Sequence, residues 1–352
     1  MLKYFIKQIS DWLIALLLVS LVIWFSFTQP VFFVSKNNNP QPVVSQENLK
    51  QHVNQLSQIY APRTISYNNL TQTARYIHQQ FTSFGDTEYQ RYETLNGKFN
   101  NVILQLGPKT NEVFVIGAHY DAEDNSLDTE GNASGVSVLI ELARHLAMDA
   151  DKLSIQVQLV AYPLSQNQSV RPFEMGGYHH AEALKQSRKK VKMMISLDSV
   201  GRFSSEKGSQ KHPFSFMSFL YPNKGDYISL VGRLQDYSEI RDVKSSFLSA
   251  SSLPLYSFNA PENFPHVSSS DHHYYWQQGY PALLVTDTAE YRDINNAVLE
   301  VSERLDYKRM ALLVKGLYQV AMDSSSQPSQ PSSRTQLVQN KPAESNDLQV
   351  PN

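Results

Sequence analysis

The chain has 352 residues, of which 41% are hydrophobic and 11% aromatic, so it is long enough and apolar enough to bury a large core. Its 31 basic and 33 acidic side chains give a net charge of −2 without a basic stripe, so no nucleic-acid partner is expected. The absence of cysteine excludes disulfides and cysteine-bound zinc, and any metal ion must therefore be held by His, Asp or Glu.

An apolar segment near the N-terminus predicts a membrane-spanning helix. Residues 13–34 carry no charge, and about 20 apolar residues are enough to cross a bilayer. Lys3 and Lys7 precede this segment, which favours a cytoplasmic N-terminus and an extracytoplasmic main domain, periplasmic in a bacterium. We expect residues 1–34 to anchor a single-pass membrane protein; a cleaved signal peptide is the alternative.

Composition divides the remainder of the chain into three parts. Residues 35–46 are polar and contain proline, which is typical of a linker. Residues 324–352 are rich in Ser, Gln and Pro, and we expect a disordered tail because they cannot bury enough apolar surface to offset the entropy lost on ordering. Residues 47–323 are expected to form one domain.

Short β-rich runs alternate with helical patterns across this domain. Near-continuous apolar strands of this kind predict a sheet covered by helices on both faces, with ligands beyond the carboxyl ends of the strands. Strands are predicted at 101–107, 112–120, 154–163, 192–201 and 279–289, and helices at 49–60, 69–85, 133–149, 179–189 and 304–323. Residues 226–238 are predicted to pass from a strand into a helix.

The predicted strand ends carry residues suited to a metal ion. His119 and Asp121 share a face of an extended segment, so Asp121 can orient a metal-binding His119 through its second ring nitrogen. Glu130 or Asp128, in the acidic loop that follows, would reach the same pocket, and Asp198 ends another strand. His119, Glu130 and Asp198 therefore form a candidate metal site, whereas a solvated turn and a helix-capping loop are the plainer alternatives.

A later polar segment adds candidates that are harder to assign. Two adjacent histidines point in different directions on an extended chain, so we do not expect His272 and His273 to bind one ion together. The aromatic residues 274–276 are expected in the core or in a pocket wall. The polar candidates in this segment are Asp271, His272, His273, Asp287 and Asn296.

Nine short motifs follow one another in an order typical of a known enzyme family. They are APR (61–63), NVI (101–103), VIGAHYD (115–121), NASGVSVLIELAR (132–144), MGGYHHA (175–181), ISLDSVG (195–201), YPNKGDYISLVG (221–232), SSDHHYYWQQGYPALLVTDTAEYR (269–292) and LDYKRMA (305–311). Through them the domain resembles peptidase family M28, the co-catalytic zinc aminopeptidases. The resemblance implies a three-layer α/β/α sandwich around a central, mostly parallel sheet, preceded here by one transmembrane helix.

The resemblance also implies a catalytic centre with two zinc ions, a bridging Asp and a Glu that acts as general base. His119 matches the first His ligand and Asp121 its orienting carboxylate. Glu130 falls on the bridging Asp, one methylene longer, and Gly131 falls on the second Asp of that pair. With Asp198 at the later Asp position, these residues leave one possible zinc site.

Three other catalytic positions depart from the family pattern. A gap-free match through Ala161, Leu164 and Met175 puts the Glu-Glu pair on Ser165 and Gln166. Ser165 cannot accept a proton from a metal-bound water at neutral pH, and the amide of Gln166 is a weak ligand. The late His ligand falls on Asn296, and no histidine follows His273.

These departures predict a membrane-anchored pseudo-peptidase with a degenerate active site, which binds a peptide or protein partner and holds one zinc ion or none. The alternative is an active zinc aminopeptidase with a rebuilt, single-zinc site, in which Glu174 is the best substitute base. A third hypothesis is a structural module whose tail makes the contacts. Other possible replacement groups are His179, His180, His266 and His272.

Overall fold

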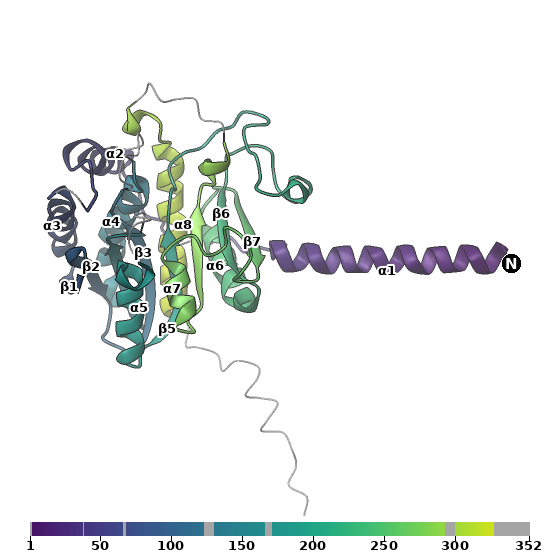
Figure 1. The fold of residues 1–352 in the computed structure, drawn as a ribbon, viewed down its shortest axis with the longest axis horizontal. Coiled ribbons are helices and arrows are strands. Elements are labelled where there is room, and N and C mark those ends of the chain that lie inside the picture. The colour runs from purple at the N-terminus through teal and green to yellow at the C-terminus, as the bar shows by residue number, and fades with distance from the viewer. Residues whose placement is uncertain are drawn as a thin grey trace, which may run out of the picture.

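The computed structural model describes residues 2–37, 39–65, 68–122, 130–165, 171–292 and 300–326 (Figure 1). An eight-stranded sheet with the order β1-β2-β4-β3-β5-β8-β6-β7 runs through the domain. Asp128, Gln166, Asn296 and the predicted tail from 327 onward lie outside the described residues. The strands are β1 Asp86–Thr94, β2 Gly97–Leu106, β3 Glu112–His119, β4 Gln156–Tyr162, β5 Lys190–Leu197, β6 Ile228–Arg233, β7 Leu255–Ala260 and β8 Ala282–Thr286.

The sheet is mixed, with a parallel centre. The pairs β3/β4, β3/β5, β5/β8 and β6/β7 are parallel, whereas β1/β2, β2/β4 and β6/β8 are antiparallel. The expectation of a mostly parallel sheet thus holds for four of the seven pairs. The antiparallel pairs place one hairpin at the β1 edge and reverse the direction of β6 and β7 at the other edge.

Helices cover both faces of the sheet, which confirms the predicted three-layer architecture (Figure 1). Alternate residues of β3 divide between the layers, because Phe114 and Ile116 pack into one core cluster and Val113 and Val115 into the other. The first cluster contains side chains of α2, α3, α4, α6 and α8, and the second those of α5 and α7. These helices are α2 Gln46–Asn54, α3 Asn69–Thr82, α4 Ala133–Met148, α5 Gly176–Gln186, α6 Tyr237–Ala250, α7 His272–Gln277 and α8 Tyr307–Ser326.

The structure corrects several boundaries predicted from the sequence. The segment with His272 and His273 is the helix α7, not an extended chain, and its burial against the sheet overrides its aromatic, β-prone composition. The closing helix starts at Tyr307 because the Asp306 carboxylate accepts the backbone N–H of Arg309 at 2.9 Å, and it continues to Ser326. The two edge strands β1 and β7 were not predicted.

The N-terminal helix α1, Leu2–Thr28, leaves the domain at the β7 edge (Figure 1). Its residues Tyr4–Thr28 are long and apolar enough to cross a membrane, so α1 is a candidate span. Its last carbonyls are bonded into the domain: Lys244 Nζ donates to the oxygens of Thr28 at 3.1 Å and Gln29 at 3.2 Å. Ser257 Oγ donates to the same Thr28 oxygen at 2.5 Å, and Asn259 Nδ2 to that of Phe27 at 3.0 Å.

Lys244 is the unusual member of this junction because it is 6% exposed. Burial lowers the pKa of its ammonium group to about 8, because the charged form is poorly solvated at this junction. Carbonyls at the C-terminal end of a helix carry partial negative charge and favour a cation there. The contact therefore fixes the end of α1 directly on the edge of the domain.

The predicted linker, residues 35–46, has no regular structure in its described part before α2 begins at Gln46. It nevertheless follows the domain surface, because the backbone N–H of Asn37 donates to Ser249 O at 3.0 Å and its side chain to Gln319 Oε1 at 2.5 Å. Val44 is buried against the core. The segment thus runs along the domain rather than separating it from α1.

Candidate functional site

The ends of three neighbouring parallel strands create the candidate site. In the register, Ala118 of β3 lies beside Leu197 of β5, and Leu197 lies beside Val285 of β8. The residues that follow, His119, Asp198 and Asp287, therefore emerge at the same edge of the sheet. This arrangement is the usual ligand-binding position of α/β folds.

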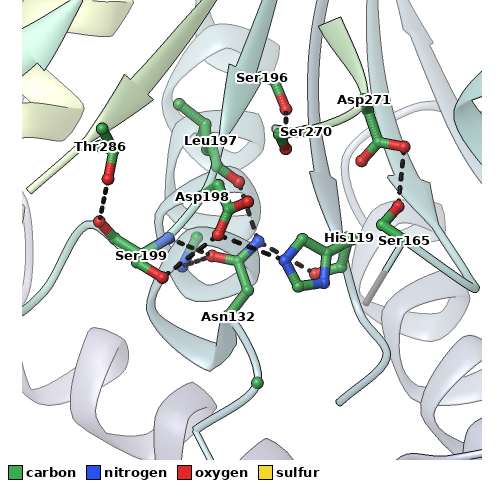
Figure 2. A network of polar contacts seen from close by, with 12 residues as sticks. His119, Asn132, Ser165, Ser196, Leu197, Asp198, Ser199, Ser270, Asp271 and Thr286 are labelled. Carbon is green, nitrogen blue, oxygen red and sulfur yellow. Dashed lines mark hydrogen bonds and ion pairs between the residues drawn. The ribbon is translucent and has the colours of Figure 1, made fainter. Parts of the chain in front are cut away.

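Asn132 joins two of these strand ends (Figure 2). Its Nδ2 donates to the carbonyls of His119 at 3.1 Å and Leu197 at 2.8 Å. Its Oδ1 accepts the backbone N–H groups of Gly135 at 3.2 Å and Ser199 at 3.0 Å, which also caps α4. The residue adopts a left-handed conformation with φ 60°, which asparagine tolerates better than most residues. Asn132 thus fixes the first turn of α4 between β3 and β5.

His119 lies between two carboxylates (Figure 2 shows the Asp198 side). Its Nδ1 is 3.3 Å from Asp121 Oδ1, and its Nε2 is 3.4 Å from Asp198 Oδ1. Burial alone would lower the pKa of His119, but the two carboxylates outweigh it and hold the pKa well above its usual range. Burial would likewise raise the pKa of Asp198, and His119 instead keeps it below its usual value. The geometry is that of a buried ion pair, with Asp121 in the position of an orienting group.

Glu130, the third candidate ligand, is engaged by two other side chains. Its Oε1 accepts from Ser134 Oγ at 2.5 Å, and its Oε2 is 3.5 Å from Arg202 Nε. Ser134 in turn accepts the backbone N–H of Val200, the second residue after Asp198. The carboxylate of Glu130 is thus directed to the start of α4 and to Arg202, a pairing that the sequence did not predict.

The backbone around Glu130 is held by a buried arginine. Arg63 is 1% exposed, and its Nη2 donates to the carbonyls of Glu130 at 2.5 Å and Gly131 at 2.7 Å. Its Nε donates to Tyr120 O at 2.8 Å, and its Nη1 to Leu56 O. One guanidinium group therefore satisfies four carbonyls on three segments and positions the loop that follows β3.

Ser165, at the position of the family's general base, bonds to a carboxylate from a distant part of the chain (Figure 2). Its Oγ donates to Asp271 Oδ1 at 2.8 Å, and its backbone N–H donates to Asp121 Oδ1 at 3.1 Å. Asp271 is fully buried, and this burial raises the pKa of its carboxyl group to about 7. Asp271 was only one of several candidates in the sequence, and its contact with Ser165 spans 106 residues.

Glu174, the predicted substitute base, is 3% exposed and supports a neighbouring hairpin. Its Oε1 accepts the backbone N–H of Leu95, in the β1–β2 turn, at 3.0 Å, and its Oε2 accepts that of Arg171 at 3.1 Å. These two bonds give the buried carboxylate a structural role. Its role as a base stays a prediction.

The four histidines named as possible replacements lie in different surroundings. His179 stacks on Tyr92 with ring centroids 4.0 Å apart, and His180 Nδ1 is 2.5 Å from Tyr275 OH. Burial lowers the pKa of His180 to about 3 and that of His272 to about 4, so both are neutral at pH 7. Of the four, His266 lines the cavity described next.

A cavity of about 380 Å³ opens beside Glu130 and Asp198. Its wall combines apolar and aromatic side chains with a comparable number of polar and charged ones. Arg202 and Ser229 are among the polar groups. The aromatic side chains are Phe214, Tyr221, Tyr227, Phe258 and Tyr291.

The donor set at the strand ends falls short of a complete zinc site. A protein zinc site needs three or four convergent ligands. His119 and Asp198 meet, but Glu130 bonds to Ser134 and Arg202, and the part of the chain that the structure describes contains no cluster of three His, Asp or Glu side chains able to hold a metal ion. In this arrangement the residues offer two zinc donors, and the predicted ligand set His119, Glu130 and Asp198 stays a prediction.

The fold is similar to that of solved structures described as zinc-dependent exopeptidases. LapB from Legionella pneumophila has a similar structure, with a TM-score of 0.62 and 18% identity over 84% of this chain and 79% of that one. The model of peptidase family M28 matches residues 101–307. The chain therefore belongs to peptidase family M28, as its motif order predicted.

The chain is also similar in sequence to two other proteins. An uncharacterized protein of Escherichia coli (strain K12), YfbL, is 38% identical over 80% of this chain and 88% of its own length. A probable zinc metalloprotease of Pyrenophora teres f. teres (strain 0-1) is 26% identical over 51% of this chain. The match spans only 40% of the length of that fungal protein.

Proposed function

We propose that this M28 member is a catalytically impaired, membrane-anchored pseudo-peptidase that binds a peptide or protein segment at the carboxyl edge of its sheet. The observation that carries the proposal is the environment of Ser165. The Ser165 hydroxyl donates to Asp271 at 2.8 Å, and an alcohol oxygen is too weak a base to take a proton from water at neutral pH. Without the family's Glu at this position, the proton-transfer contribution of that base, roughly 10²–10⁴-fold, is lost.

The zinc ligands support the same proposal. A co-catalytic pair needs donors for two ions, and in M28 enzymes the ions activate water and stabilise the tetrahedral intermediate. Here Glu130 is paired with Arg202, a cation that already compensates its carboxylate charge. One zinc ion at His119, Glu130 and Asp198 would compete with Ser134 and Arg202 for the carboxylate of Glu130.

The aromatic cavity supports a binding role. Its volume of about 380 Å³ fits one large apolar side chain with part of a peptide backbone, and Asp198 and Arg202 at its wall offer an acceptor and a donor to backbone groups. We therefore expect a peptide with a leucine or aromatic side chain to bind more tightly than one with glycine at that position.

The proposed compartment follows from α1. An uncleaved anchor is supported by the bonds of Lys244, Ser257 and Asn259 to its last carbonyls, because removing α1 would take away the hydrogen-bond acceptors of these buried donors. Lys3 and Lys7 favour a cytoplasmic N-terminus, which would put the domain in the extracytoplasmic space.

Peptide binding can be tested with a variant that fills the cavity from its mouth. Ser269 is exposed and lines the cavity, so Ser269→Trp should weaken binding of a leucine- or phenylalanine-containing peptide by at least about tenfold, the loss of about 1.4 kcal/mol. Fluorescence anisotropy with the full-length chain in nanodiscs measures the affinity, and mass spectrometry shows whether the peptide stays intact.

Ser83→Trp, at an exposed serine directly after α3, is the matched control and should bind like the wild type. Equal affinities for the Ser269 and Ser83 variants would disprove binding in the cavity. Cleavage of the bound peptide would favour the active, rebuilt enzyme instead.

A further inference from the structure

The domain-side end of α1 is surrounded by exposed aromatic side chains. The chain turns back after Gln29, and Phe32 lies 6.3 Å from Trp24 between ring centroids. From the loop between β5 and β6, Phe216 approaches Phe27 at 6.2 Å in an edge-to-face contact. In Figure 1 this loop, drawn in teal, reaches out on the side of the sheet from which α1 leaves.

The most exposed of these side chains lie at the tip of that loop and in the turn after α1. Phe219 is 90% exposed and Phe216 is 42% exposed, and both belong to the short 3₁₀ segment Ser215–Phe219. Phe32 is 67% and Phe33 is 94% exposed. A group of apolar rings at one edge of a domain indicates a surface that is covered by something else.

The depth of these rings follows from the geometry of α1. A hydrocarbon core of about 30 Å takes about 20 helical residues, so a span that begins near Tyr4 reaches the interface near Trp24, a residue type enriched there. Phe27 lies about 4.5 Å farther along the axis, within the headgroup layer. Lys244 ties the end of α1 to the domain, and Phe216 contacts Phe27. The Phe216–Phe219 segment is therefore held at the depth of the headgroup layer.

We propose that the Ser215–Phe219 segment inserts Phe216 and Phe219 into the bilayer interface beside α1, as a second membrane contact of the domain. The occupant of this surface is the phospholipid interface, because the rings continue the apolar surface of the span itself. The proposal rests on the anchoring role of α1 proposed above, and it goes beyond it by assigning a lipid contact to a loop 190 residues away in the chain.

The same loop forms part of the cavity wall. Phe214 stacks on Phe216 with ring centroids 5.9 Å apart, and Phe214 and Met217 line the cavity beside Asp198. Insertion of the tip therefore fixes one wall of the cavity at the membrane surface. The cavity would then lie beside the membrane surface, so a peptide held at that surface could enter it directly.

The absence of cysteine permits a clean labelling experiment on the full-length chain. Three single variants, Phe219→Cys, Leu95→Cys and Leu17→Cys, are labelled with an environment-sensitive fluorophore and reconstituted into phosphatidylcholine–phosphatidylglycerol vesicles. Leu95 is the matched control, because it is 81% exposed in the β1–β2 turn at the opposite edge of the sheet. Leu17 lies within α1 and reports the span.

The label at 219 should shift its emission to the blue. Quenchers in the upper acyl chain should reduce that emission more than quenchers at the chain ends, because an interfacial contact is only about 5–10 Å deep. The label at 95 should show neither effect. A label at 219 that behaves like the one at 95, while the label at 17 is quenched, would overturn the proposal and leave the anchor intact. A label at 17 that is not quenched would overturn both.

Discussion

Replacing Arg63 with glutamine should lower the free energy of unfolding by about 3–5 kcal/mol, well above the usual effect of a single substitution. Glutamine has two amide donors on a shorter side chain, so it cannot reach the carbonyls of Leu56, Tyr120, Glu130 and Gly131 together. Buried carbonyls that lose their donor are expensive, at about 1–3 kcal/mol each. Chemical denaturation of the full-length chain in detergent, followed by near-ultraviolet circular dichroism, measures the difference.

The control for this variant is Arg75→Gln, the same substitution at an exposed position of α3. It should change the free energy of unfolding by less than about 0.5 kcal/mol. Arg63→Lys should also be destabilised, because a single ammonium group cannot reproduce a planar guanidinium that bonds to several carbonyls. Similar stabilities of the Arg63→Gln and Arg75→Gln variants would show that Arg63 does not hold the loop.

The second large effect is expected at Asn132, where two substitutions separate hydrogen bonding from backbone conformation. Asn132→Gly loses all four side-chain hydrogen bonds but accepts a φ of 60° without strain. We expect it to lower the free energy of unfolding by about 2–4 kcal/mol, since buried carbonyls and N–H groups lose their partners.

Asn132→Ala should be worse than Asn132→Gly by about 1 kcal/mol, because alanine adds the cost of a left-handed conformation. This order is the reverse of that inside a regular helix, where alanine is the better residue. The same denaturation experiment ranks the two variants. An alanine variant more stable than the glycine variant would contradict the assignment of φ strain at this position.

The central strands of the fold could be predicted from the sequence because they are apolar on both faces. Segments such as β3 and β4 are almost entirely buried and stand out as continuous hydrophobic runs. The edge strand β1 alternates between exposed and half-buried residues and is rich in charge, so it resembled a loop. In α7, tertiary packing overrode the local preference of HHYYWQ.

The candidate site was predictable where its residues follow those central strands. His119 and Asp198 end β3 and β5, and the parallel register brings them together. The contacts of Ser165 with Asp271 and of Glu130 with Arg202 join segments without any sequence periodicity in common, so no local pattern could predict them. The carboxylate of Glu130 in an acidic loop suggested a metal ligand, but only the structure identifies Arg202 as its cationic partner.

The central claim is that peptidase chemistry has been lost from an intact M28 fold. Its most direct test is the hydrolysis of a panel of aminoacyl anilides by the purified full-length chain with excess zinc, compared with His119→Ala prepared in the same way. We expect equal rates for both proteins, at the level of the zinc-containing buffer, because Ser165 supplies no general base. Turnover by the wild type that disappears in His119→Ala would contradict the claim and establish a rebuilt active enzyme.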